Sequence, residues 1–329
     1  MNIKYKLLIQ HGTAFFAPPT IDGVSVEWQR TGQPGKLTFS CVKTAPLSFE
    51  EGDAVHFSVN GKAFFKGFVF TKARSGQESK IIKVTCYDQL YYFKNKETYV
   101  IENKTASAVL RMVCADFGLK TGVIEPTGYV IKSQVEDNSA LFDIVENSLD
   151  MTRKSTGKRF TLFDNAGKIE LLSDNSMKFN YLINKDSIGD FDYSTTIDGV
   201  YNRVKLSQEK SDSGSDKTIK NRKTFIAQDP VNMKKWGVLQ YTEKLNNDDK
   251  DGQAKAQSLL KQNNKKKRSL SFKDVLGDTR VRAGCLIPCV LGLGDMNLSK
   301  YLRVEQVQHD FSDSEHLMSI RLIGGDNFV

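Results

Sequence analysis

The sequence of 329 residues lacks any apolar run of the about 18 to 20 residues that a membrane-spanning helix needs. The longest candidate, CLIPCVLGLG, is interrupted by Pro288 and Gly292. The N-terminal segment MNIKYKLLIQHG carries Lys6 and no small-residue cleavage site, so we expect neither a signal peptide nor membrane insertion. The expected location is therefore the cytoplasm of the cell that makes the protein.

Cysteines are few and odd in number. The five, Cys41, Cys86, Cys114, Cys285 and Cys289, all lie in apolar text, where reduced and buried thiols are expected. Cys285 and Cys289 are spaced like a metal pair, but their segment has the pattern of a strand. Four residues of strand separate the two sulfur atoms by about 13 Å, which is too far for one zinc ion.

Recognisable catalytic motifs are also missing. There is no G-x-S-x-G elbow, and DSGSD at 212–216 lies in polar loop text. GQPGKLT, Gly32–Thr38, resembles a phosphate-binding loop, but it contains Pro34 and leads into a strand. GLGDMN at 292–297 has half of a dinucleotide-binding fingerprint, between strands. We therefore predict no catalytic residue and no cofactor-binding residue.

One polar group is dense enough to suggest a metal site. It consists of His309, Asp310, Asp313 and His316. The same residues span FSDSEH, where Asp and Ser are expected for β-turn geometry and local hydrogen bonds. The preferred interpretation is a solvated turn, so no metal site is predicted.

Acidic residues are fewer than basic residues. The chain has 47 Lys and Arg residues and 39 Asp and Glu residues, which gives a net charge of +8. The sharpest basic cluster is NNKKKR at 263–268, directly after a helical pattern. Lysines are favoured at a helix C-terminus by the helix dipole, and no aromatic residues interleave with this run. Nucleic-acid binding is thus kept as an alternative and not as the leading hypothesis.

Strand patterns fill residues 1–100. Seven short strands are separated by turn signals such as PPTIDG, TGQPG and EEGD, and Asn60–Gly61 between FSV and AFF is a strong hairpin signal. Evenly spaced short strands favour a small closed barrel, because closure removes exposed edges.

The period changes at about residue 101. TASAVLRMVCADFGL predicts a helix capped by Thr105, and NSALFDIVENSLDMTRKS predicts a second helix capped by Asn138 or Ser139. GKRFTLFDNAGKIELLS reads as a hairpin that turns at residues 165–167. Strands return after about residue 190, with a helix at about 250–264 and a polar loop at 210–223 that we expect to be mobile.

The two ends of the chain repeat one pattern. Phe39 in KLTFSC precedes Gly52, and Phe272 in RSLSFK precedes Gly284 at nearly the same spacing; Val55 and Ile287 follow these glycines by three residues. We predict a mainly β (α+β) fold with two related small β-barrels around an inserted α/β domain. The predicted domains are 1–100 (first barrel), 101–190 (α/β domain) and 191–329 (second barrel, with the one helix).

Several segments together resemble a known family. FEEGDAVHFSVNGKAFFKGFVF with CYDQLYYFKNKETYVI, then VEDNSALFDIVENSLDMT, and finally GDTRVRAGCLIPCVLGLGD with YLRVEQVQHDF are similar in order and spacing to XkdQ-like proteins. These are baseplate hub proteins of contractile phage tails, of R-type bacteriocins and of PBSX-type prophages, similar to the myovirus hub. The match extends over nearly the whole chain.

The resemblance implies a non-enzymatic hub without cofactors. It implies a homotrimer whose six barrels form a pseudo-sixfold ring between the hexameric tail tube and the trimeric central spike. Tube protein, spike protein and other baseplate proteins are the implied partners, nucleic acid is implied only as cargo in the channel, and the implied final location is the baseplate of the released particle. A peptidoglycan hydrolase or its carrier, and a basic nucleic-acid-binding protein, are the alternatives.

Overall fold

Strands predominate in the computed structural model of the chain, as the sequence pattern predicts. The chain forms two compact units, one built from Met1–Asp192 with Ser271–Leu322 and the other containing Tyr193–Leu270. The residues that the structure describes are 3–45, 47–76, 80–188, 191–211, 220–245, 251–294, 297–313 and 315–323.

The N-terminal strands form an antiparallel array in the spatial order β3-β4-β7-β6-β5-β1-β2. Buried and half-buried side chains alternate along β4 and β5, as in strands with one face on a core. Asn60 and Gly61 have φ angles of 49° and 77° and form the predicted hairpin turn. The strands are β1 (Tyr5–His11), β2 (Ala14–Phe16), β3 (Thr20–Gln29), β4 (Lys36–Val42), β5 (Ala54–Val59), β6 (Lys62–Ala73) and β7 (Ile81–Tyr87).

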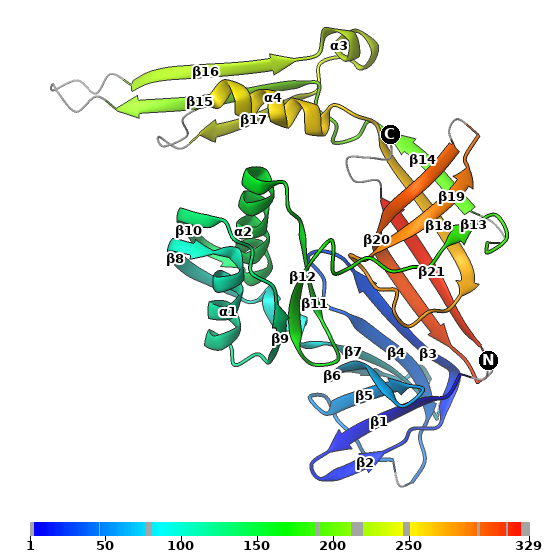
Figure 1. Ribbon diagram of the computed structural model, residues 1–329. Coiled ribbons are helices and arrows are strands. Elements are labelled where there is room, and N and C mark those ends of the chain that lie inside the picture. The colour runs from blue at the N-terminus through cyan, green and yellow to red at the C-terminus, as the bar shows by residue number, and fades with distance from the viewer. Residues whose placement is uncertain are drawn as a thin grey trace. The chain divides into compact units, whose positions relative to one another are not determined.

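The C-terminal strands repeat this order. Their sequence across the sheet, β14-β18-β21-β20-β19-β13, matches β3-β4-β7-β6-β5-β1 strand for strand (Figure 1). One difference is that β13 runs parallel to β19, whereas β1 runs antiparallel to β5. The strands are β13 (Ile183–Asn184), β14 (Phe191–Thr196), β18 (Lys267–Leu276), β19 (Leu286–Gly292), β20 (Asn297–Phe311) and β21 (His316–Ile323).

The repeated glycines occupy equivalent positions. Gly52 has a φ of 95° and donates its N–H to the Val69 carbonyl at 2.8 Å, while Gly284 has a φ of 90° and donates to the Val304 carbonyl at 2.7 Å. Val69 and Val304 each donate back, at 2.9 Å, to the residue after the glycine. The sequence repeat therefore corresponds to a structural repeat in which Val69 is equivalent to Val304.

Both groups of strands belong to a single 13-stranded sheet. The joint is an antiparallel pairing of β3 with β20, which extends from Gln29 opposite Gln306 to Val24 opposite Phe311. Arg30 strengthens it, because its Nε donates to Glu305 Oε2 at 2.7 Å and its backbone N–H donates to the Glu305 carbonyl at 2.9 Å. Inside one chain, the first group of strands is thus hydrogen-bonded to the second.

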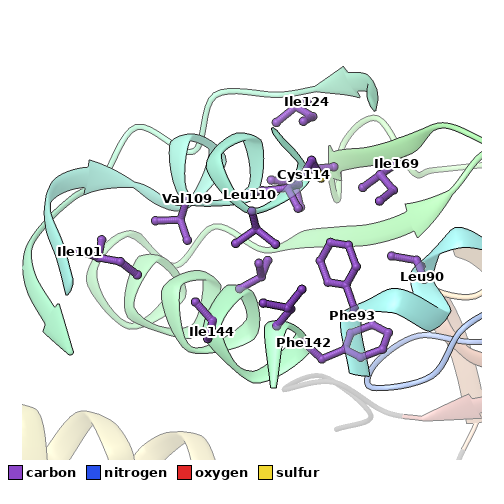
Figure 2. Close-up of a cluster of buried hydrophobic side chains, with 14 residues drawn as sticks. Leu90, Phe93, Ile101, Val109, Leu110, Cys114, Ile124, Phe142, Ile144 and Ile169 are labelled. Atoms are coloured by element: carbon purple, nitrogen blue, oxygen red, sulfur yellow. The ribbon is translucent and has the colours of Figure 1, made fainter. Parts of the chain in front are cut away.

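An α/β segment lies between the two groups of strands in the sequence. Its core is filled by apolar side chains of α1, α2, β9, β12 and the 3₁₀ helix η1, with Leu110, Phe93 and Ile144 pointing toward one another (Figure 2). The elements are η1 (Gln89–Lys94), β8 (Lys96–Thr105), α1 (Ala106–Asp116), β9 (Thr121–Ile124), β10 (Val130–Ala140), α2 (Leu141–Thr156), β11 (Phe160–Asp164) and β12 (Ile169–Ser173).

Of the predicted helix caps in this segment, one is right and one is wrong. Thr105 caps α1, since its Oγ1 accepts the Ala108 N–H at 3.3 Å. Neither Asn138 nor Ser139 caps α2, because β10 continues through both residues and α2 begins directly after Ala140, which makes no side-chain cap bond. The predicted hairpin at residues 165–167 connects β11 and β12.

The second unit contains the elements that lie between β14 and β18 in the sequence, together with the adjoining ends of these two strands. Its sheet, in the order β16-β15-β17, packs one face against α4 through Val204, Leu206, Ala227, Leu245, Ala256 and Leu259. The helix predicted at about 250–264 is confirmed, whereas α3 was not predicted. The predicted mobile loop at 210–223 lies in part outside the described residues, which omit 212–219. The elements are β15 (Arg203–Ser211), β16 (Lys220–Gln228), α3 (Pro230–Trp236), β17 (Gln240–Leu245) and α4 (Gly252–Asn263).

The mainly β fold class is confirmed. The boundaries proposed near residues 100 and 190 stay a prediction.

Candidate functional site

The polar group considered for a metal does not converge on one point. Asp310 accepts two hydrogen bonds from the Gln308 amide, at 2.9 and 3.1 Å, and Asp313 accepts one from Tyr5 Oη at 3.4 Å. Only His309 and His316 meet, with 2.8 Å between Nδ1 of the first and Nε2 of the second. Within the described ranges, no three His, Cys, Asp or Glu residues are grouped so as to hold a metal ion.

The prediction of a solvated turn is wrong for these two histidines. They lie on adjacent strands β20 and β21, with 0% and 3% of their surface exposed. The Val281 carbonyl can only accept, so His309 Nε2 donates to it at 2.9 Å and His309 Nδ1 accepts from His316. Burial lowers the pKa of His309 to about 3 and that of His316 to about 4, so both rings are neutral at pH 7.

A buried charge cluster joins three parts of the first unit. The Arg282 guanidinium lies between two aromatic rings, 4.9 Å from the Trp28 ring centre and 4.4 Å from that of Phe163. One of its NH2 groups donates to the Asp164 carbonyl at 3.0 Å. Trp28 belongs to β3, Phe163 to β11, and Arg282 to the segment between β18 and β19, so this side chain connects both groups of strands with the α/β segment.

Two carboxyl groups complete this cluster. Asp88 accepts the N–H groups of Gly35 and Leu90 at 2.9 and 3.0 Å, and Asp164 accepts the Gly167 N–H at 2.7 Å and the Gln89 amide at 2.8 Å. Burial raises the pKa of both carboxyls, and the charge of Asp164 raises that of Asp88 further. The adjacent cavity measures about 10 Å³, the volume of a single water site, which leaves no room for a substrate.

In the loop that resembles a phosphate site, backbone N–H groups already donate to carboxylates of this chain. Gly32 donates its N–H to Glu146 Oε1 at 3.0 Å, and Gly35 donates to Asp88 at 2.9 Å. These bonds attach the β3–β4 turn to α2 and to the start of η1, so the glycines serve to hold the fold together. The motif at 292–297 and DSGSD at 212–216 lie partly or wholly outside the described residues.

All five cysteines are free and buried. Burial raises the pKa of each thiol, which suppresses the reactive thiolate. The predicted role as small apolar side chains is confirmed.

A strand edge is the strongest candidate for an interface. β3 pairs with β4 on one side and with β20 on the other, whereas its equivalent, β14, pairs with β18 alone among the described strands. Thr71–Ala73 of β6 pair with β7, and on their other edge no described strand continues the pairing that β5 makes with Lys62–Phe68. β14 and the end of β6 therefore each have an edge along which no described strand pairs.

Positive charge is concentrated in the second unit. Residues 193–270 contain 17 Lys and Arg and 9 Asp and Glu, a net charge of +8, while the other 251 residues contain 30 of each kind. Asn264, in the NNKKKR run, donates to Asp229 at 2.6 Å and accepts from Asn232 at 2.9 Å, so this run lies beside α3 with its exposed Lys234 and Lys235. The structure thus enlarges the basic cluster that the sequence suggests.

None of the helices in the described part of the chain has the length and apolar character required to span a membrane.

Comparison with known proteins places these features in context. The chain matches the YQBQ-like family over residues 24–323. It is 30% identical over 311 residues to the YqbQ protein of Bacillus subtilis strain 168, covering 92% of this chain and 91% of that protein. It is 29% identical to the phage-like element PBSX protein XkdQ of the same organism, with 92% of each chain covered.

A solved structure with a similar fold is the 43 kDa tail protein of prophage MuSo2 from Shewanella oneidensis. The TM-score is 0.68 at 14% sequence identity, and the match covers 98% of this chain and 99% of the other.

Proposed function

The chain belongs to the YQBQ-like family, and from this premise we propose that it is a non-enzymatic structural hub in the baseplate of a contractile phage tail or phage-tail-like particle. Three copies form a ring with six related groups of strands, which adapts the sixfold tail tube to a threefold central spike. Support comes from the XkdQ relative of a phage-like element and from the fold shared with a prophage tail protein. The released tail particle is the corresponding location.

The observation that carries the proposal is the internal repeat with its joint. The joint between β20 and β3 is heterologous, because different strands of two related groups meet. β6 is equivalent to β20 and β14 is equivalent to β3, yet β6 and β14 are not paired with each other. Repeating the joint between copies places β14 of one copy beside β6 of the next, and the repetition closes a ring at three chains.

The register of this joint follows from the repeat. Val69 is equivalent to Val304. β6 has a β-bulge between Val69 and Thr71, and the burial alternation of β20 is interrupted at the same place, where Val304 and Glu305 are both buried, so Thr71 is equivalent to Gln306. Ser194 contacts Ser269 at 2.7 Å between the Oγ atoms, as Glu27 contacts Lys36 in the first group, so Thr196 is equivalent to Gln29. Because Gln306 lies opposite Gln29, Thr71 of one copy lies opposite Thr196 of its neighbour.

Disulfide cross-linking tests this register. Both threonines are exposed and the native cysteines are buried, so a Thr71→Cys, Thr196→Cys variant has two reactive thiols. We expect mild oxidation to produce covalent trimers on a denaturing gel without reductant, because opposed strand residues bring their Cβ atoms within about 5.5 Å.

The matched control is Thr71→Cys with Thr195→Cys. Thr195 is also exposed, but successive strand residues point to opposite faces of a sheet, so this pair should cross-link poorly. Equal cross-linking of the two double variants would refute the β6–β14 joint, and so would the absence of cross-linking in both.

The charge distribution favours nucleic-acid binding as a second candidate function. The net charge of +8 confined to residues 193–270 is an electrostatic footprint of the kind that binds phosphates. This candidate predicts retention of DNA on filters at about 150 mM salt, lost when Lys265, Lys266 and Lys267 become Glu. The hub proposal predicts no retention at that salt concentration.

A peptidoglycan hydrolase is the remaining alternative. Zymography of the purified chain tests it, since a cleared band would contradict a non-enzymatic hub.

A further inference from the structure

A surface pocket of about 420 Å³ lies within the first unit. Its volume is in the range of about 300–1,000 Å³ typical of sites for small ligands and anchoring side chains. Apolar side chains make its walls, and they come from elements distant in the sequence: Ala54 of β5, Phe68 of β6, Tyr92 of η1, and Phe117 and Leu119 after α1. These apolar groups are half-buried.

The walls are held in place by regular structure. Phe68 lies in β6 opposite Ala54 of β5 and opposite Tyr87 of β7, and its ring lies 6.3 Å from that of Tyr92. Gly118, with a φ of 62°, follows the C-cap residue of α1, Phe117, and the Leu119 N–H donates to the Cys114 carbonyl at 2.8 Å. The pocket is therefore preformed and does not require a rearrangement to admit a ligand.

The rim is positively charged. Lys66 and Lys120 line the pocket, and no Asp or Glu is among the described residues that line it. Neither ammonium group has an ion-pair partner among the residues that the structure describes. The Lys66 side chain is positioned by Gly167, where a Cβ would lie 2.8 Å from its Cδ atom.

We propose that this pocket binds a segment of a partner protein through one aromatic or branched aliphatic side chain flanked by carboxylates. The apolar walls would desolvate the side chain, and Lys66 and Lys120 would pair with the acidic groups beside it. Apolar anchors that fill such pockets contribute most of the binding energy of protein interfaces. This inference concerns a partner other than a second copy and does not depend on the ring.

A short peptide tests the site in the full-length chain. The probe is acetyl-Gly-Asp-Phe-Asp-Gly-amide with 4-fluorophenylalanine in place of Phe, observed by fluorine NMR during titration with protein. We expect binding with a Kd of about 1 mM or tighter, and at least about tenfold weaker binding when Lys flanks the fluorophenylalanine in place of Asp. The Lys66→Gln, Lys120→Gln variant should also bind the Asp-flanked probe at least about tenfold more weakly than the native chain does.

Matched variants separate this site from general attraction to a basic protein. Lys62→Gln, Lys132→Gln removes two exposed lysines that do not line the pocket, and it should bind the probe within about twofold of the native chain. The idea is overturned if this control loses as much affinity as the rim variant, or if the probe does not bind at about 5 mM.

Light scattering on the rim variant distinguishes this inference from the hub proposal. Retention of the native mass together with loss of the probe supports an external partner. A fall in mass caused by the rim substitutions would show that a second copy occupies the pocket, which would overturn the assignment to another protein.

Discussion

At the scale of single residues, the least predictable feature is the cluster around Arg282. Its members are far apart in the sequence. Judged from its neighbours in the sequence, each of them resembles an ordinary charged surface residue or an ordinary aromatic core residue. Only the fold brings the guanidinium between Trp28 and Phe163 and beside two buried carboxyl groups. We interpret the cluster as a structural junction, because its cavity excludes a substrate.

Arg282→Met should destabilise the chain by about 3–5 kcal/mol, because it removes a buried cation and leaves Asp88 and Asp164 without its compensating charge. Urea denaturation measures the change. Arg280→Met is the matched control: its side chain is 59% exposed and pairs with the nearby Asp278, so less than about 1 kcal/mol is expected. Equal effects would contradict the junction.

The histidine pair predicts acid sensitivity. Both rings have folded-state pKa values of about 3 and about 4, below the unfolded value of 6.5, so the unfolded chain binds more protons below pH 6.5. The free energy of unfolding is therefore unaffected by these groups above pH 6.5 and falls as the pH decreases toward 4. Between pH 7 and pH 5 we expect a loss of about 2 kcal/mol for each ring.

A variant with His309→Gln and His316→Gln isolates this contribution. Its free energy of unfolding should decline less between pH 7 and pH 5 than that of the native chain. Parallel pH curves for the native chain and the double variant would show that the pair is not neutral in the fold.

At the scale of elements, local sequence patterns predicted several strands, turns and helices correctly. Alternation of apolar residues, the Asn60–Gly61 turn, the Thr105 cap and the α4 pattern are all local, and each is confirmed. The cap of α2 was mispredicted because β10 pairs with β8 through the residues that locally favour a cap. The short helix α3 was missed although Asp229 and Pro230 are a helix-start signal, since its seven residues bury none of their side chains.

The equivalent glycines give a prediction at this scale. Gly52→Ala should cost about 1–2 kcal/mol, because the new Cβ has open space and only the positive φ is unfavourable. Gly284→Ala should cost at least about 2 kcal/mol more, because its Cβ would collide with the buried Thr161 side chain. Thermal and urea unfolding of the two variants measure the difference.

A rescue variant checks the cause. Thr161→Gly should recover part of the loss in the Gly284→Ala background and none in the Gly52→Ala background. Equal costs for the two alanines would mean that the contact between β11 and the C-terminal strands is not tight.

At the scale of the whole molecule, the repeat was visible in the sequence but the joint was not. KLTFSC and RSLSFK with their following glycines indicated two related groups of strands. The pairing of β3 with β20 connects residues about 280 positions apart, and no local pattern encodes such a partner. The concentration of positive charge became apparent only when the structure delimited the second unit.

In the proposed ring, the joint would give the duplication a purpose. One chain with two related groups of strands makes the internal contact once, and each contact between copies would repeat it. Three chains would then present six similar positions to a sixfold tube while keeping threefold symmetry for a spike.

The mass of the native chain in solution, measured by light scattering after gel filtration over about 1–100 µM protein, tests the ring most directly. One chain weighs 37.0 kDa, so the account predicts a species of about 111 kDa that becomes dominant as the concentration rises. A constant mass of 37.0 kDa, or a closed dimer of about 74 kDa, would contradict the ring of three copies.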